Sequence, residues 1–257
     1  MGSALAAGWI ASGRPADSFF AVDPRPGPAA ARLREAGVRI EKTLSAEDAA
    51  GVKTVLLAVK PQIMDEAAAA VARLLPADAM LVSILAGKTL DRLKEAFGDR
   101  PYVRSMPNTP AAVGKGYTVY VASGGAPRER VEEARSLLAA GGDTAELENE
   151  GQMDAVTAVS GSGPAYFFLL AEALAAAGRA EGLPEDLAAD LARATLIGSG
   201  ALLESSTETP GRLREGVTSP GGTTAAALDV LTKEPGLPAL MRRAVAAAAG
   251  RSRELRG

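Results

Sequence analysis

The sequence predicts an α/β protein, with a doubly wound, mostly parallel sheet in the N-terminal part and only helices in the C-terminal part. Short runs of β-branched residues alternate with Ala-, Leu- and Arg-rich stretches through the first half, which is typical of βαβ units. Residues 55–59 show no polar alternation, as expected of a central strand covered on both faces. From Met153 onward we find no strand pattern. We therefore expect a domain with the parallel sheet over residues 1–150 and a helical domain over residues 151–257.

The individual elements follow from local periodicity and from helix signals. The expected strands are residues 19–22, 38–40, 54–58, 79–84, 102–106, 118–122 and 144–147. The helices expected between them are residues 29–36, 63–75, 90–97 and 128–140, where apolar residues recur every three or four positions. Ser45 with Asp48 has the spacing of a capping box and predicts a further short helix. The expected helices of the second part are residues 163–180, 184–205, 224–232 and 237–255.

Composition excludes several kinds of chemistry. The chain of 257 residues carries 28 Lys and Arg against 31 Asp and Glu, a formal net charge of -3, and it has no His and no Cys. It therefore has no Ser-His-Asp triad, no thiolate nucleophile, no disulfide and no zinc site of the Cys/His kind, and we expect no metal. The acidic balance argues against a nucleic-acid partner. No apolar run is long enough to span a membrane and no secretory signal is visible, so we expect a cytoplasmic protein.

The helical part is rich in small residues and has few large apolar side chains for each helix. Such helices pack closely but have little core of their own. We therefore expect a homodimer or a higher homo-oligomer built on the C-terminal helices.

Several short segments combine glycine or proline with polar residues near the ends of the expected elements. They are Ala58-Val59-Lys60-Pro61-Gln62, Met106-Pro107-Asn108-Thr109-Pro110, Ser160-Gly161-Ser162-Gly163-Pro164-Ala165-Tyr166 and Val217-Thr218-Ser219-Pro220-Gly221-Gly222-Thr223-Thr224. The first two follow strand ends, and ligands bind at the carboxyl edge of a doubly wound sheet. Each segment also has a purely structural interpretation, as a rigid turn, a helix break or a capped helix start.

The last of these segments is the most informative. Gly221 and Gly222 precede a helix opened by Thr223 or Thr224, and backbone N–H groups at a helix N-terminus bind an anion without Lys or Arg. For Lys60 we favour a solvated or phosphate-facing charge over a catalytic role.

Together, and in this order, the segments resemble those of the pyrroline-5-carboxylate reductase family, which makes proline from a cyclic imine precursor. The resemblance covers nearly the whole chain. It implies a Rossmann-like N-terminal domain, a helical substrate and dimerisation domain, and NADPH or NADH as the coenzyme. It also implies hydride delivery to the C=N carbon of 1-pyrroline-5-carboxylate.

The resemblance assigns roles to individual residues. Thr224 and Asn108 are the implied catalytic residues, Thr224 through a hydrogen bond to the ring nitrogen and Asn108 by orienting the nicotinamide or the substrate. The implied substrate-binding residues are Ser219, Gly221, Gly222 and Thr223. The coenzyme-binding residues are expected to be Gly2, Asp23, Arg25, Ala58, Val59, Lys60, Pro61, Asn108, Ser160 and Gly161.

Two residues after the first expected strand give opposite indications about the coenzyme. Asp23 stands where an acidic residue binds the ribose 2′-hydroxyl of NAD, whereas Arg25 could pair with the additional phosphate of NADP. The sequence therefore leaves the choice between NADH and NADPH open.

The N-terminus departs from the family pattern. Family members begin with a strand and a G-x-G-x-M-G loop, and this sequence matches only the final Met-Gly of that loop and the helix beyond it. We therefore expect that the natural protein extends upstream of Met1 by a central strand and two glycines.

Two alternatives remain open at this point. One is a β-hydroxyacid dehydrogenase-like oxidoreductase, against which we note that residues 163–180 contain no Lys to serve alcohol oxidation. The other is a coenzyme-free binding protein derived from the reductase fold.

Overall fold

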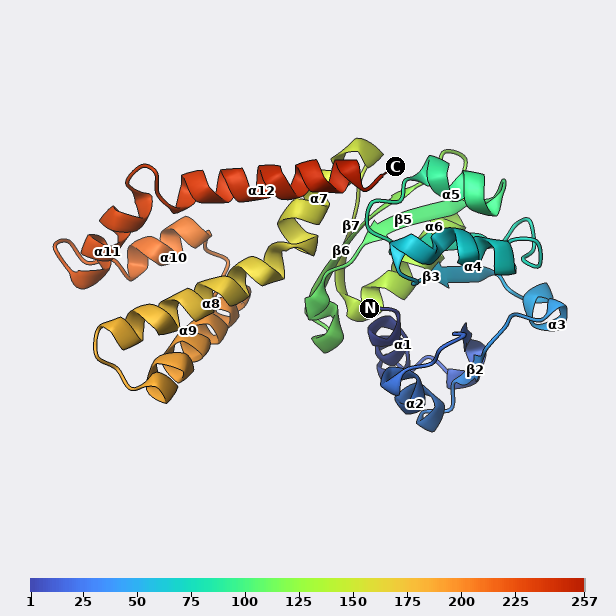
Figure 1. Cartoon of the computed structure of the whole chain (residues 1–257), viewed down its shortest axis with the longest axis horizontal. Coiled ribbons are helices and arrows are strands. Elements are labelled where there is room, and N and C mark those ends of the chain that lie inside the picture. The colour runs from blue at the N-terminus through green and yellow to red at the C-terminus, as the bar shows by residue number, and fades with distance from the viewer. Residues whose placement is uncertain (257) are drawn as a thin grey trace. The chain divides into compact units, whose positions relative to one another are not determined.

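The computed structural model describes residues 1–256, which form two compact units (Figure 1). Unit 1 comprises residues 1–161 together with 248–256, and unit 2 comprises Ser162–Ala247. The C-terminal end of the chain thus belongs to the same unit as its N-terminal half. The boundary between the compact units lies after Gly161, whereas the expected domain boundary lies near residue 150. The division into functional domains stays a prediction.

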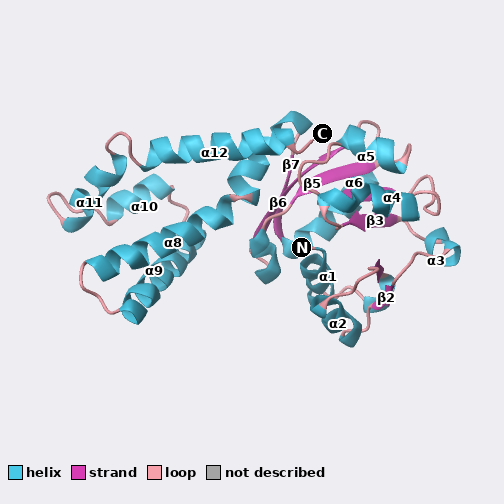
Figure 2. Cartoon of the chain, viewed as in Figure 1, coloured by secondary structure: helices cyan, strands magenta, loops and turns pink. Residues whose placement is uncertain are grey.

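Unit 1 contains two sheets (Figure 2). The smaller sheet pairs β1 (Phe20–Val22) with β2 (Arg39–Glu41) in parallel. The larger sheet has the order β3 (Thr54–Leu57), β4 (Met80–Ser83), β5 (Tyr102–Met106), β6 (Gly116–Ala122) and β7 (Gly142–Glu146). All its pairs are parallel except β5 with β6. The expected α/β fold with a mostly parallel sheet is confirmed, but β1 and β3 are not hydrogen-bonded to each other, so the sheet is not continuous.

Helices cover both faces of the larger sheet. The helices of the first part of the chain are α1 (Gly2–Ala11), α2 (Pro28–Glu35), α3 (Ala46–Ala50), α4 (Met64–Val71), α5 (Leu90–Phe97), α6 (Arg128–Leu138) and α7 (Met153–Val156). Alternation along β4 builds two cores, since Met80 and Val82 pack with residues of α1 and α6, whereas Leu81 packs with residues of α4 and α5. Ser45 caps α3 as expected, because its hydroxyl accepts from Asp48 N at 3.0 Å.

Unit 2 contains helices only. They are α8 (Gly163–Ala180), α9 (Glu185–Ser205), α10 (Pro210–Gly216), α11 (Thr223–Thr232) and the first part of α12 (Leu237–Glu254). The expected helices of this region are confirmed to within a residue or so, but α10 was not anticipated. Its start has a clear physical cause, because Thr209 Oγ1 accepts from Arg212 N at 3.3 Å and Pro210 occupies the first turn.

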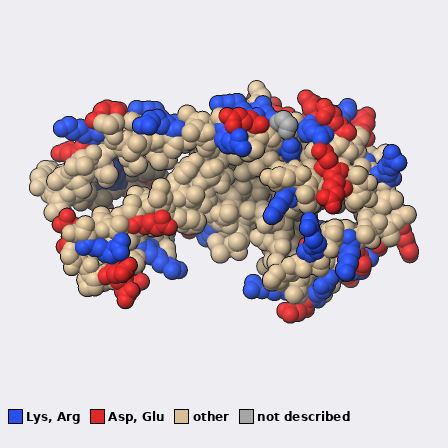
Figure 3. All heavy atoms as spheres, viewed as in Figure 1, with Lys and Arg blue, Asp and Glu red and all other residues tan. Residues whose placement is uncertain are grey.

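None of the helices among residues 1–256 is long and apolar enough to cross a membrane. On the face of the molecule in Figure 3, basic and acidic side chains are interspersed over both units.

Candidate functional site

The first helix begins at the carboxyl end of strand β3. A Cβ on Gly2 would lie 2.7 Å from Ala58 Cβ, so only glycine lets the start of α1 come this close. No side chain caps α1. The first N–H groups of a helix have no partner within the helix and attract anions. This corner therefore has the geometry of a phosphate site.

The residues after β3 continue along the same edge. Ala58 and Lys60 are exposed, and Pro61 opens a single turn of 3-10 helix that leads into α4. An exposed Lys60 agrees with the solvated or phosphate-facing role that the sequence favours.

A tight turn closes the end of β1. Asp23 Oδ1 accepts from Arg25 N at 2.9 Å, and Asp23 N donates to Glu41 O at 2.8 Å across the small sheet. The carboxylate of Asp23 is thereby fixed at the strand end, while Arg25 is exposed. The two residues with opposite indications about the coenzyme are thus held in one turn.

Asn108 joins two of the segments that the sequence singled out. Its Nδ2 donates to Ser160 Oγ at 3.1 Å, and its Oδ1 accepts from Tyr117 N at 2.9 Å. The Asn108 amide therefore holds Ser160 in place with bonds internal to unit 1. This arrangement gives Asn108 a positioning function, and its catalytic role stays a prediction.

Ser160 and Gly161 lie in a π-helical turn, Thr157–Gly161, which we call the π segment. Thr157 Oγ1 donates to Met153 O at 2.9 Å, and a Cβ at Gly161 would collide with Met106 Cε. The sequence predicts a helix break here, whereas the structure has a widened helical turn followed by α8. Such turns are frequent at functional sites.

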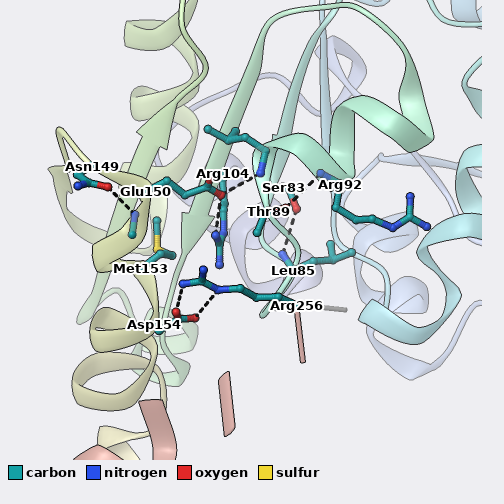
Figure 4. A network of polar contacts seen from close by, with 12 residues as sticks. Ser83, Leu85, Thr89, Arg92, Arg104, Asn149, Glu150, Met153, Asp154 and Arg256 are labelled. Carbon is teal, nitrogen blue, oxygen red and sulfur yellow. Dashed lines mark hydrogen bonds and ion pairs between the residues drawn. The ribbon is translucent and has the colours of Figure 1, made fainter. Parts of the chain in front are cut away.

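A buried polar network beside the π segment was missed by sequence reasoning (Figure 4). The Arg104 side chain, only 1% exposed, donates from Nη1 to Glu150 Oε1 at 2.6 Å. Asp154 is equally buried and accepts from Ser252 Oγ at 2.8 Å and from the guanidinium of Arg256. A charged residue inside the apolar run of residues 102–106 is the signal that could have found Arg104.

In unit 2, the predicted substrate loop forms a turn before α11. Gly222 N donates to Ser219 O at 3.0 Å, and Gly221 has φ 70°, a backbone angle that favours glycine. No side chain caps α11, so the N–H groups of Thr223 and Thr224 at its start have no partner within the helix. The loop thus offers backbone donors to a small anion such as a carboxylate.

The structure accordingly brings predicted site residues together in groups. Gly2 packs against Ala58, and Asp23 accepts a hydrogen bond from the backbone of Arg25. Asn108 is hydrogen-bonded to Ser160, next to Gly161. Residues 219–224 form a separate group within unit 2. Among residues 1–256, no group of three or more carboxylates could hold a metal ion. The roles of individual residues stay predictions.

Family models match both parts of the chain. A model described as pyrroline-5-carboxylate reductase dimerisation matches residues 150–255, and one described as NADP oxidoreductase, coenzyme F420-dependent, matches residues 1–87.

Relatives of known family match nearly the whole chain. The pyrroline-5-carboxylate reductase of Pseudomonas aeruginosa is 40% identical over 256 residues, which covers 99% of this chain and 93% of that protein. The Synechocystis reductase of the same name is 43% identical over 210 residues, covering 81% of this chain and 78% of that protein.

Solved structures agree with this result. A pyrroline-5-carboxylate reductase from Coxiella burnetii has a TM-score of 0.90 at 30% identity and covers 99% of this chain and 94% of its own. The Plasmodium falciparum pyrroline carboxylate reductase, solved with NADP bound, has a TM-score of 0.84 at 29% identity and covers 100% of this chain and 95% of its own.

Proposed function

The chain belongs to the pyrroline-5-carboxylate reductase family, and we propose that it reduces 1-pyrroline-5-carboxylate to L-proline, the last step of proline biosynthesis, with NADPH or NADH. One observation carries this proposal: identity of 40% over 99% of the chain with a reductase of that name. The segments that suggested the family in the sequence lie between residues 58 and 224, within the matched length.

The coenzyme supplies the hydride, and residues of unit 1 are suited to hold it. The start of α1 at Gly2 offers backbone N–H groups to the pyrophosphate, and its close approach to Ala58 leaves no room for a larger residue. Asp23 and Arg25 are placed in one turn to contact the adenosine ribose or its phosphate. The other residues proposed to contact the coenzyme are Val59, Lys60, Pro61, Asn108, Ser160 and Gly161, with the Lys60 charge assigned to a phosphate.

Residues of unit 2 are suited to hold the substrate. We assign the substrate carboxylate to the backbone N–H groups that open α11, with Ser219, Gly221, Gly222 and Thr223 forming the loop. Thr224, in the first turn, is assigned a hydrogen bond to the ring nitrogen.

This chemistry needs little from the side chains. Because an imine nitrogen can be protonated before hydride attack, amides and hydroxyls that bind and orient the substrate are sufficient. Catalysis then rests on proximity and orientation, which accounts for a reductase whose sequence has no His.

We further propose that the protein is a homodimer or a higher homo-oligomer assembled through the unit 2 helices. Residues 150–255 match the dimerisation model of the family. Phe167, Phe168, Leu169 and Leu170 are consecutive in α8 and are 58%, 61%, 64% and 50% exposed. A helix that is apolar all round is normally buried, so a second surface is expected to cover it. A cytoplasmic location and the absence of nucleic-acid or membrane partners stay predictions of the sequence.

A direct assay tests the activity. The purified protein is incubated with 1-pyrroline-5-carboxylate and either NADPH or NADH, and coenzyme oxidation and proline are both measured. We expect one proline for each coenzyme oxidised. Coenzyme binding without proline formation would favour another oxidoreductase, and no coenzyme binding would favour a binding protein.

A further inference from the structure

Three alternate residues of one extended stretch contact the segment that carries Ser160. Arg104, Met106 and Asn108 are two residues apart, and Asn108 keeps extended backbone (φ -125°, ψ 166°) beyond the end of β5. Alternate residues of an extended chain point to the same side. Arg104 binds Glu150, the Met106 side chain packs on Gly161, and Asn108 binds Ser160. One side of β5 and its extension therefore sets the position of residues 150–161.

The same segment is held by the C-terminal end of the chain. Asp154, in α7, accepts from Ser252 Oγ at 2.8 Å. It also pairs with Arg256 (Figure 4). This end is itself anchored on unit 1, because a Cβ on Gly87 would lie 3.0 Å from Leu255 O. Glu150 has a second partner too, since its Oε1 accepts from Leu90 N, at the start of α5, at 2.9 Å.

We propose that Arg104, Glu150, Asp154 and Arg256 form a positioning clamp, which holds α7 and the π segment so that Ser160 stays in hydrogen-bonding distance of Asn108. The inference rests on the proposed function for the meaning of Ser160, which is assigned to the coenzyme. Through the clamp, Arg256 at the C-terminal end is a positioning residue for a reductase site that it does not touch.

The charges explain why the clamp is rigid. The Arg104 and Asp154 side chains are 1% and 3% exposed. Because water does not solvate these two charges, each depends on its ion-pair partner. The π segment follows these anchors, and its Ser160 and Gly161 contact Asn108 and Met106. Its position is therefore set by its neighbours.

The experiment compares Arg256→Gln with Arg256→Lys and with Arg253→Gln, which changes an exposed residue in the last turn of α12, three positions before Arg256. Hydrogen exchange is followed at the amides of residues 157–161 and at those of β4, and kcat, KM and the coenzyme dissociation constant are measured in parallel. For Arg256→Gln we expect exchange at 157–161 to become about tenfold faster while β4 is unchanged. We expect kcat to fall about tenfold with KM and coenzyme affinity changed less than about threefold, because orientation and not binding is lost.

Arg256→Lys keeps the charge and should recover most of both effects, and Arg253→Gln should behave as the unchanged protein. The proposal is overturned if Arg256→Gln leaves exchange at 157–161 unchanged, if Lys restores no more than Gln, or if β4 exchanges faster to the same extent, which would indicate general destabilisation. Failure of the proposed function is a separate result: the unchanged protein would then form no proline, while the exchange comparison would still decide on the clamp.

Discussion

Unit 1 buries large side chains on both faces of its larger sheet, whereas unit 2 leaves most of its large apolar side chains exposed. The largest fully buried residues of the described chain, such as Tyr102, Tyr120 and Phe97, all lie in unit 1. The buried apolar residues of unit 2 are Ala188 and Ala192 alone among those described. Large exposed apolar surfaces mark interaction sites, which supports the proposed assembly through unit 2.

Two ion pairs, one from each unit, differ in the same way in the exposure of their side chains. In unit 1, Arg104 pairs with Glu150 at 1% exposure of the arginine, whereas in unit 2 the Arg179 and Glu185 side chains are 50% and 78% exposed. A charge that is buried with one partner depends on that partner, while an exposed charge has water as an alternative. The Arg104–Glu150 pair of unit 1 thus depends on burial, whereas the Arg179–Glu185 pair of unit 2 is solvated.

The largest expected effect is on assembly. Phe168→Glu places a charge on the exposed apolar helix α8, and we expect it to dissociate the oligomer, because a carboxylate is costly to bury without a partner. Light scattering coupled to gel filtration measures the mass. The matched control is Leu74→Glu, an apolar residue of unit 1 that is 38% exposed, and it should leave the mass unchanged. An unchanged oligomer in Phe168→Glu, or a monomeric unaltered protein, would contradict this view of unit 2.

The second prediction compares the ion pairs. Glu150→Gln leaves the buried Arg104 charge without a counter-charge, and we expect the free energy of unfolding to fall by about 3 kcal/mol. Arg179→Gln in unit 2 should lower it by less than about 1 kcal/mol. Urea unfolding at one protein concentration measures both values. Equal losses would show that burial does not separate the two pairs.

The third prediction concerns the loop before α11. Gly221→Val forces a β-branched residue to φ 70°, so the carboxylate-binding turn should be distorted and KM for the substrate should rise at least about tenfold. Thr224→Ala should lower kcat and change stability little, because no side chain caps α11. Coenzyme affinity, measured by nicotinamide fluorescence, should stay near that of the unaltered protein in both variants. Full activity in Thr224→Ala would show that the Thr224 hydroxyl has no role in the site.

The smallest effect is electrostatic and local to unit 1. The hydrogen bond from Arg39, helped by the Ser45 hydroxyl, lowers the pKa of Asp48 below its ordinary value. A lowered pKa means that the ionised form is favoured in the folded protein, so its small contribution to stability is present at neutral pH and is lost as the pH falls through the pKa of the folded state. A carboxyl NMR titration should show this lowered pKa, and Arg39→Gln should raise it. A pKa of Asp48 that does not respond to Arg39→Gln would show that the pair is not formed in solution.

Much of the fold could be predicted because local signals and tertiary packing agree. The residues 102–106 and 90–97 form the expected strand and helix without change. The antiparallel pairing of β5 with β6 was not foreseen, because strand direction depends on the path of the connection and not on strand composition.

The site was predictable in its segments and less so in its contacts. Glycine and proline patterns located the loops, since these residues mark special backbone geometry. That Asn108 binds Ser160, and that Asp154 binds Arg256, depends on residues far apart in the chain, and no local pattern reports such pairs. Arg104 alone gave a visible signal, as a charge inside an apolar strand.

The central claim is that the chain catalyses hydride transfer from the coenzyme to the C=N carbon of 1-pyrroline-5-carboxylate. The most direct measurement uses coenzyme carrying deuterium at the transferable position of the nicotinamide C4, followed by NMR of the proline that forms. The account predicts proline with deuterium at C5, the former imine carbon, and a strong loss of that product in Thr224→Ala. Proline without deuterium, or no proline at all from a protein that binds the coenzyme, would contradict it.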